Sequence, residues 1–490
     1  MRSLKALALA SLVLAAVLAV RTWRIGGRDE PVAPAPPRAV EVARVAEALA
    51  GAIRIPTVSS DESEAPAAEL AALRAHLEAA FPRVFSTLER EEIAGGTLLL
   101  RWPGADPALA PVLLLAHQDV VAADPGDGRW TQPPFAGALA GGFVWGRGAI
   151  DDKGSMVAIL AAVDALLESG FAPVRTVLLG FGHDEERGGA GARALAARLA
   201  ERSVRLALVL DEGLAITEEL VPGVERPVAL LGTTEKGYAS FELVAEAPGG
   251  HSSMPARETA ISILARAVDR VAGTPMPSRG DAPVYAMLDA IAPAADLATR
   301  FAVANRWLLG PLLERQLAKS PATDALLRTT LVPTVIAAGG KENVVPAAAR
   351  AVVNARLLPG DSVAEVETEL RRRIDDARVT LRPPPSGLAS EASPKSPVDG
   401  WGYRTLSRSV REVLPEAVVA PGLMVGATDA RHFVGITEET IRFQPIVLRP
   451  GDPERFHGVD ERVSLADLEL AVRVYARFLE NAARGRAGSD

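Results

Sequence analysis

The stretch Val174–Glu186, VRTVLLGFGHDEE, contains the pattern that decides the fold. Its first nine residues form a mostly apolar run, which is typical of a strand buried on both faces of a parallel sheet. The run ends in His183, Asp184, Glu185 and Glu186. Ligand sites in open parallel sheets lie beyond the carboxyl ends of the strands. This segment therefore predicts a buried strand that leads into a functional site.

The same pattern recurs outward along the chain in both directions. The run PVLLLA (111–116) leads into His117-Gln118-Asp119, and LALVL (206–210) leads into Asp211-Glu212-Gly213. A glycine-rich turn at 146–150 leads into Asp151-Asp152. Amphipathic segments over 40–50 and 67–80 predict helices before these strands, and residues 155–169 and the Ala-rich segment 189–201 predict helices between them. Strands that alternate with helices favour an α/β fold with a mainly parallel sheet, so we expect the four clusters to converge.

The pattern changes near Gly232. Residues 238–247, YASFELVAEA, alternate between apolar and polar, as a half-exposed strand does. A smaller α+β domain is expected over 233–390, with further elements at 259–271, 349–357 and 363–374 and a helical insert at about 278–329. This domain interrupts a catalytic α/β domain that comprises 40–232 and 391–490, with a Pro/Ser-rich return linker over 382–397.

Composition limits the function. The 490 residues include 53 Lys and Arg against 61 Asp and Glu, a net charge of −8, which argues against a nucleic-acid partner. Hydrophobic residues make up 48% of the chain, an ordinary globular balance that excludes wholesale disorder. The absence of cysteine excludes disulfides, thiolate metal sites and cysteine nucleophiles. Any metal must therefore be held by nitrogen and oxygen ligands, and clusters of imidazole and carboxylate suit zinc or a similar divalent ion.

The amino terminus predicts export or membrane anchoring. The apolar run Ala6–Val20 follows a basic start. As a helix this run would be about 22 Å long, short of the ~30 Å hydrocarbon core of a bilayer. This length suits a signal peptide, whereas Arg21 and Arg24 directly after it are more typical of an anchor. Both readings of residues 1–25 stay open. A Pro-rich linker is expected over 26–39.

Several segments together resemble a known family, the dinuclear zinc aminoacylase/carboxypeptidase enzymes of metallopeptidase clan MH. The likeness extends over about residues 40–485. It is nearest to the branch of carboxypeptidase S and the N-fatty-acyl-amino-acid hydrolase/synthase, which the insert and GATDARHF (426–433) resemble in particular. The other matching segments are HQDVV (117–121), GRGAIDDKG (146–154), GHDEERGG (182–189), LDEG (210–213), EKGYASFELVAEAPGGHSSMP (235–255), GGKENVVP (339–346) and HGVDERV (457–463).

The resemblance implies a role for each matching residue of the catalytic domain. The first zinc would be bound by His117, Asp151 and Asp211. The second would be bound by Asp151, Glu186 and His457, so that Asp151 bridges the two ions. Glu185 would be the general base, Asp119 would orient the imidazole of His117, and the Asp151–Asp152 peptide would be cis.

The resemblance also implies that the inserted domain is a ferredoxin-like lid. His251 would close onto the scissile carbonyl and stabilise the developing oxyanion. Asn343 and Arg356 are candidates for holding the substrate, Arg356 through a free carboxylate. Asp429 and His432 are interpreted as lining the pocket near the leaving group. Relatives often dimerise through the lid, and a homodimer is one option here.

The function implied is zinc-dependent hydrolysis of amide bonds in short peptides or N-acyl amino acids, with a water between the metals activated by Glu185. Cobalt or manganese could replace zinc. Two alternatives stay open: an N-fatty-acyl-amino-acid hydrolase/synthase specifically, and an inactive binding protein on the same fold. The apolar Trp307-Leu308-Leu309 of the insert suits a fatty acyl chain, although a core tryptophan would explain it equally well.

Overall fold

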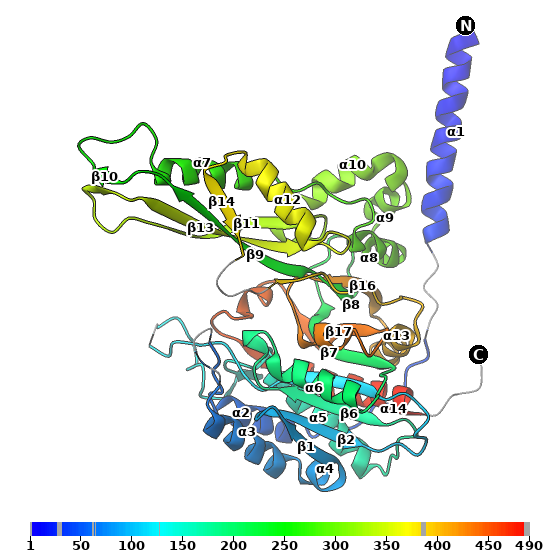
Figure 1. The fold of residues 1–490 in the computed structure, drawn as a ribbon. Helices are drawn as coiled ribbons and strands as arrows, with labels where there is room; N and C mark the ends of the chain where they lie inside the picture. The colour runs from blue at the N-terminus through cyan, green and yellow to red at the C-terminus, as the bar shows by residue number, and fades with distance from the viewer. Residues whose placement is uncertain are drawn as a thin grey trace.

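The computed structural model describes residues 2–26, 32–60, 63, 65–126, 128–383 and 389–484. Figure 1 shows a lower domain, an elongated upper lid and a long helix, α1, that projects on its own. The predicted linkers over 26–39 and 382–397 each fall partly outside the described residues.

The lower domain is organised around an eight-stranded sheet. The order is β1-β2-β6-β3-β7-β17-β8-β16. The four central strands β6, β3, β7 and β17 are parallel to one another, as are β8 and β16, whereas β2 pairs antiparallel with β6 and β8 with β17. This confirms the predicted α/β class with a mainly parallel sheet. The strands are β1 (Glu89–Ile93), β2 (Thr97–Trp102), β3 (Val112–His117), β6 (Val177–Gly182), β7 (Leu208–Thr217), β8 (Val228–Glu235), β16 (Val418–Met424) and β17 (Thr440–Leu448).

Helices cover both faces of this sheet because its central strands are apolar on both sides. Leu114 of β3 packs in one core, whereas Leu113 and Leu115 point into the opposite one. The first core contains α2 (Val42–Ile53), α3 (Ala67–Ala80), α4 (Pro82–Thr87), α5 (Lys153–Glu168), α13 (Trp401–Val413) and α14 (Leu465–Ala483). The second contains α6 (Ala190–Glu201) and the short helix η3 (Asp429–Phe433). A separate small sheet consists of β4 (Ala138–Ala140), β5 (Phe143–Trp145) and β18 (Arg462–Ser464).

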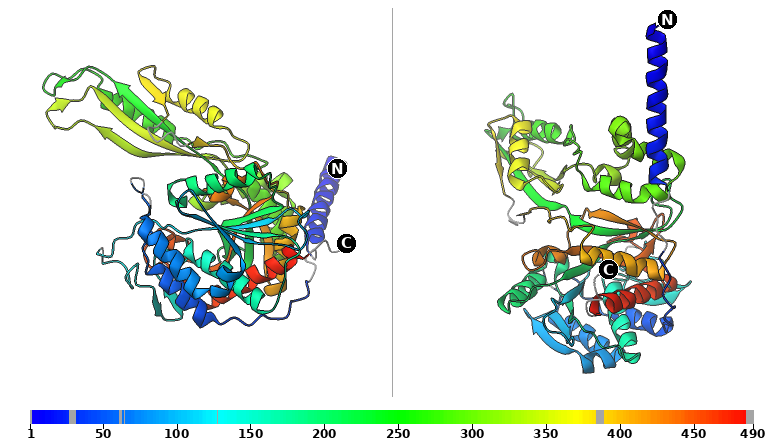
Figure 2. Two further views of the ribbon diagram at one scale, coloured as in Figure 1. Left: turned by 60° about the horizontal axis from the view of Figure 1, so that its bottom comes forward. Right: turned by 90° about the vertical axis from the view of Figure 1, so that its right-hand side faces the viewer.

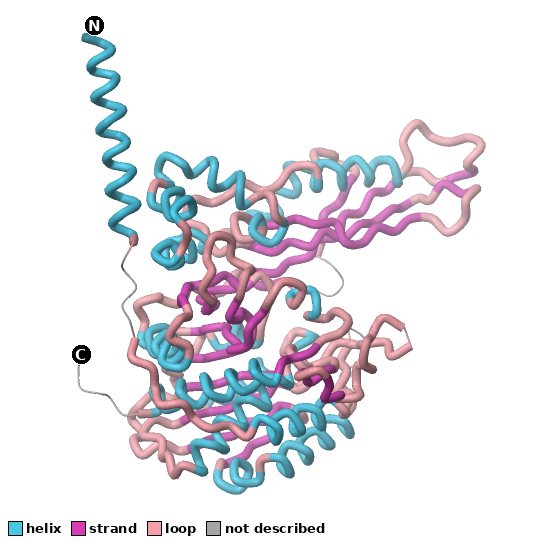
Figure 3. The backbone as a smooth tube through the Cα atoms, turned by 180° about the vertical axis from the view of Figure 1, so that it is seen from behind, coloured by secondary structure: helices cyan, strands magenta, loops and turns pink. Residues whose placement is uncertain are grey.

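The lid is an antiparallel sheet packed against two helices, as expected for an α+β lid domain. Its strands are β9 (Gly237–Glu246), β11 (Thr330–Ala338), β13 (Ala348–Leu357), β14 (Val379–Arg382) and β15 (Ala389–Ser390), and its helices are α7 (Ala260–Ala272) and α12 (Val363–Ile374). The chain leaves the central sheet at Glu235 and enters the lid sheet at Gly237. At the far tip, β10 (Gly250–His251) pairs with β12 (Val344–Val345), well away from the lower domain in Figures 1 and 3.

The insert forms a group of helices at the other end of the lid. These are α8 (Pro283–Ile291), the short helix η2 (Ala292–Ala294), α9 (Leu297–Ala304), α10 (Arg306–Leu317) and α11 (Pro321–Asp324). Leu288 and Ile291 of α8 share a core with Val418 and Ala420 of β16. The insert therefore rests on the edge of the central sheet as well as on the lid.

Helix α1 (Arg2–Ile25) is longer than the apolar run that predicted it. It continues through Arg21 and Arg24 and has 24 residues. A helix of that size measures about 36 Å, enough to cross the ~30 Å hydrocarbon core of a bilayer. Figure 2 shows its lower part beside the insert helices and its upper part free. Helix α1 is long and apolar enough to cross a membrane, although signal sequences also meet this criterion of length and composition.

Candidate metal centre

The predicted clusters converge at the carboxyl edge of the central sheet. His117 is the last residue of β3, and Glu185 and Glu186 begin a short helix, η1 (Glu185–Arg187), directly after β6. Asp151 lies in the loop between β5 and α5, and its peptide bond to Asp152 is cis, as expected. The parallel arrangement of β6 and β3 is what brings these side chains to one place.

Asp151 lies between two imidazoles. Its Oδ1 is 2.8 Å from Nε2 of His117, and its Oδ2 is 3.1 Å from Nε2 of His457. Oε1 of Glu186 is 3.2 Å from that same atom of His457. One carboxylate facing two histidines with opposite oxygens is the arrangement expected of a ligand that bridges two metal ions. His117, Asp151 and Glu186 also offer donor atoms that all lie within 4.8 Å of one another.

The structure separates Asp211 from this cluster and brings Glu212 into it. Asp211 and Glu212 are adjacent residues inside β7, which continues to Thr217 rather than ending at Leu210. Successive side chains of a strand point to opposite faces. Asp211 accepts backbone hydrogen bonds from Ala430 (2.6 Å) and Glu212 (3.0 Å). Oε1 of Glu212 instead lies 3.5 Å from Nε2 of His117. The predicted role of Asp211 therefore fits Glu212 better.

The carboxylate of Asp119 joins two of the clusters. Its Oδ1 lies 3.4 Å from Nδ1 of His117, a ring that is only 1% exposed. Asp119 also accepts hydrogen bonds from the backbone N–H groups of Glu185 (3.1 Å) and Glu186 (3.3 Å) and from the Ser59 hydroxyl (2.5 Å). Nδ1 of His117 is hydrogen-bonded to the main-chain carbonyl of Asp119 (2.9 Å). Asp119 therefore suits the predicted orienting role mainly through its backbone, whereas its carboxylate holds the segment that bears the predicted base.

An ion pair that sequence reasoning missed supports the loops of Asp151 and His457. Oε1 of Glu461 accepts hydrogen bonds from the backbone N–H groups of Gly148, Ile150 and Asp151 at 3.0, 2.8 and 3.1 Å. Its Oε2 accepts from Arg147 (2.6 Å), and Arg147 also donates to the carbonyl of His457 (3.0 Å). Arg147 lies in GRGAIDDKG and Glu461 in HGVDERV, two of the segments that carry the family resemblance. Their place in these segments is the one sequence feature that could have pointed to a role for them.

The predicted pocket residues Asp429 and His432 lie in η3, close to the base. Asp429 is buried, and its charge is among those that act on Glu185. A Cβ atom at Gly189 would overlap with its carboxylate, and Gly189 has a φ of 66°, so both space and backbone favour glycine there. His432 lies with Nε2 3.2 Å from the carbonyl of Gly188. Burial lowers the pKa of His432 to about 4.

The predicted lid residues lie at its two ends. Arg356 is near the hinge, where its guanidinium stacks over the ring of Tyr238 at 4.8 Å. His251 and Asn343 meet at the tip, where the backbone N–H of Ser252 donates to the carbonyl of Asn343 (3.1 Å). His251 is exposed and is bonded to Ser253. In this conformation the structure does not bring His251 to the metal-ligand cluster (Figure 1).

The electrostatics of the cluster fit a divalent cation. Burial would lower the pKa of His117, but the carboxylates of Glu212, Asp119 and Asp151 outweigh burial and raise it well above its ordinary value. Hydrogen bonds to Asp151 and Glu186 raise the pKa of His457 to about 10. Burial, with neighbouring acidic charge, raises the pKa of Glu185 and of Glu212. A nearby positive charge favours the ionised form of such crowded carboxylates, and the nitrogen and oxygen donors suit zinc.

A family model described as Peptidase family M20/M25/M40 matches residues 113–481. The chain belongs to this family. The N-fatty-acyl-amino acid synthase/hydrolase PM20D1 of Xenopus tropicalis is 42% identical over 444 residues, which cover 89% of this chain and 86% of that protein. Carboxypeptidase S of Saccharomyces cerevisiae is 29% identical, over 89% of this chain and 83% of its own length.

Among solved structures, the M20 family metallo-carboxypeptidase Sso-CP2 from Sulfolobus solfataricus matches with a TM-score of 0.65. At 18% identity, over 89% of this chain and 98% of the other, this likeness supports the fold. The family, the α/β fold with its lid and the assignment as a hydrolase of an M20 metallopeptidase type are thus confirmed. The site is that of a metal-dependent enzyme.

Proposed function

We propose that this M20 enzyme is a dinuclear zinc amidohydrolase that cleaves N-acyl amino acids with a long acyl chain. The observation that carries the proposal is the 42% identity, over most of both chains, to an enzyme named for N-fatty-acyl amino acids. The lower identity to carboxypeptidase S makes short peptides the second candidate substrates.

His117 and Glu212 would hold one ion, His457 and Glu186 the other, with Asp151 between them. This set replaces Asp211 of the sequence-based prediction with Glu212, in line with the 3.5 Å distance between Glu212 and His117. Two ions bound there would lower the pKa of a water and polarise the amide carbonyl.

Glu185 would move the protons. It lies three residues beyond the end of β6, and its backbone N–H donates to Asp119. Its neighbour Glu186, not Glu185, pairs with His457. In the proposed reaction its carboxylate takes a proton from the attacking water and passes it to the nitrogen of the leaving amino acid. Burial raises the pKa of Glu185, which suits a group that must both accept and return a proton.

The lid would supply the remaining contacts. Arg356 is a fork-shaped cation on the inner end of β13, suited to bidentate pairing with the free carboxylate of an amino acid. His251 would donate to the oxyanion after the lid closes, which its present exposed position requires. A homodimer through the lid is also proposed, supported by the exposed apolar Val332, Val335 and Ile336 on the edge strand β11.

Amino-acid release by the zinc-loaded full chain tests the substrate. The panel pairs N-oleoyl and N-acetyl forms of the same amino acids with hydrophobic dipeptides, and each reaction is repeated with a chelator. We expect chelator-sensitive release at least tenfold faster from the N-oleoyl substrates. Faster release from dipeptides would support the carboxypeptidase S-like alternative, and no chelator-sensitive release would support an inactive binding protein.

A further inference from the structure

Helix α10 of the insert packs Leu313 and Leu317 against a core but leaves its other large apolar side chains largely in solvent. Its sequence, RWLLGPLLERQL, has six Trp or Leu among twelve residues, and none of the twelve is buried. Trp307, Leu308 and Leu312 are 55%, 44% and 64% exposed, and on the neighbouring α9 Leu297 and Phe301 are exposed as well. Soluble proteins rarely leave such a group of large apolar side chains in water. We call these five residues the insert face.

The insert is joined to the lower half of α1 by polar contacts. The amide of Asn305, a fully buried side chain, donates to the carbonyl of Leu18 (3.3 Å) and the hydroxyl of Thr22 (3.1 Å). Nε of Arg21 donates to the carbonyl of Ala304 (3.0 Å). These bonds fix α1 against the turn between α9 and α10.

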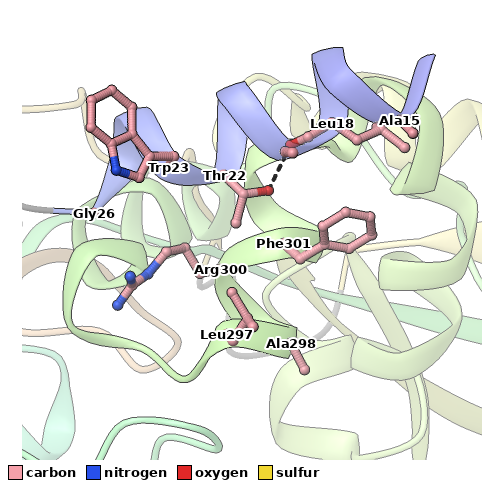
Figure 4. A pocket seen from close by; sticks show the side chains of 10 residues that line it. Ala15, Leu18, Thr22, Trp23, Gly26, Leu297, Ala298, Arg300 and Phe301 are labelled. Carbon is pink, nitrogen blue, oxygen red and sulfur yellow. Dashed lines mark hydrogen bonds between the residues drawn. The ribbon is translucent and has the colours of Figure 1, made fainter. Parts of the chain in front are cut away.

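A hollow of about 1050 Å³ lies between α1 and α9, and Figure 4 shows the side chains that line it. Leu18 and Ala15 on α1 face Phe301 and Leu297 on α9 across a largely apolar space. The hollow extends along α1 from Ala15 down to Gly26. The insert thus reaches as high on α1 as Ala15.

The length of α1 determines what surrounds the insert. The part of α1 above the hollow is Arg2–Leu14. It measures about 20 Å, less than the ~30 Å of hydrocarbon in a bilayer. If α1 crosses the bilayer, part of the segment beside the insert must also lie within the membrane. Trp23 at the base of α1 and Trp307 on α10 are of a residue type that gathers at the membrane–water interface.

We propose that the insert face is a second membrane contact, which docks α9 and α10 into the near leaflet of a phospholipid bilayer beside α1. The hollow between α1 and α9 then opens into the lipid and takes an acyl chain of a phospholipid. This inference concerns how the protein sits on a membrane and does not depend on the substrate proposed above.

The natural absence of cysteine allows a direct test in the full chain. Leu312→Cys, labelled with an environment-sensitive fluorophore, reports on the insert face. Leu139→Cys on strand β4 of the lower domain is the control, because it is an exposed leucine (43%, against 64% for Leu312) outside both the lid and the insert. Val13→Cys reports on the free part of α1. The proteins are reconstituted in vesicles of four parts phosphatidylcholine to one part phosphatidylglycerol, with either doxyl-labelled lipid or aqueous iodide as quencher.

We expect doxyl lipid to remove at least half of the fluorescence at positions 13 and 312, and iodide quenching at 312 to fall severalfold on reconstitution. The label at 139 should respond to iodide alone. The proposal is overturned if position 312 behaves like position 139, whether or not position 13 enters the bilayer. It is also overturned if position 312 is shielded from iodide without vesicles in a concentration-dependent way, since a second copy of the chain would then cover the insert face.

Discussion

The Asp151 cluster and the lid tip that carries His251 are built in opposite ways. Around Asp151 the side chains are largely buried, and Asp119 and the Arg147–Glu461 pair hold the ligand loops by charge-assisted hydrogen bonds. At the tip, His251 is exposed on a two-residue strand pair. The difference teaches that the Asp151 cluster, the rigid half of the proposed site, is already assembled, whereas the role proposed for His251 requires the lid to move.

The largest effect is expected at the centre of the rigid half. Glu185→Gln removes the proton acceptor but keeps the shape of the side chain, so kcat should fall by about 10²–10⁴-fold. Zinc content, measured by mass spectrometry of the dialysed protein, should stay at the wild-type level. Loss of zinc together with activity would make Glu185 a ligand instead of a base.

Substitution of His251 at the lid tip should have a different effect on the kinetics. His251→Ala should lower kcat by about 10²–10³-fold, the range for removal of one oxyanion donor, with zinc content and melting temperature unchanged. His251→Gln, which keeps an N–H donor, should recover part of the loss. Wild-type kcat in both variants would show that the lid tip takes no part in the reaction.

Substitutions at Asp211 and Glu212 should show which of these two neighbours is the metal ligand. Glu212→Gln should weaken zinc binding by more than the roughly 10–100-fold that outer-shell partners contribute, because a direct ligand is lost. Asp211→Asn should be milder, since its amide oxygen can still accept the Ala430 hydrogen bond. Zinc affinity by competition with a chelator compares the two, and the reverse ranking would restore Asp211 as the ligand.

A smaller effect is expected from the Arg147–Glu461 ion pair, which supports the ligand loops of the rigid half. Glu461→Gln leaves the guanidinium of Arg147 buried without its charge partner. It should lower zinc affinity about 10–100-fold, with a loss of thermal stability. Glu91→Gln is the matched control, since Glu91 pairs with Arg198 and Arg202 on the surface and should change neither property measurably. Equal behaviour of the two variants would mean that the ion pair does not position the ligand loops.

Sequence reasoning found the parts of the fold that apolar runs reveal. Strands β3 and β6 and helix α6 lie within three residues of their predicted bounds, because buried strands and amphipathic helices have clear patterns. Strands β8 and β16 were not predicted. β16 is the edge strand of the central sheet and β8 lies beside it, and this placement follows from tertiary pairing that local patterns do not contain.

At the site, too, physical reasons limit what could be predicted from the sequence. His117, Asp151, Glu186 and His457 come together as the resemblance implied, but Asp211 and Glu212 are neighbours, so only the strand geometry decides which one faces the cluster. Arg147 and Glu461 are 314 residues apart in the chain, and nothing in either segment alone predicts their contact.

The large distance in sequence between Glu461 and the Asp151 loop has a consequence for biosynthesis. His457 and Glu461 lie near the end of the chain, yet Glu461 holds the loop of Asp151, made 310 residues earlier. A growing chain therefore contains most of the acidic cluster long before it can be completed. With the ligand set proposed above, the second metal site would be complete only after the segment of His457 has been made, and an exported chain would then take that metal from the compartment in which it finishes folding.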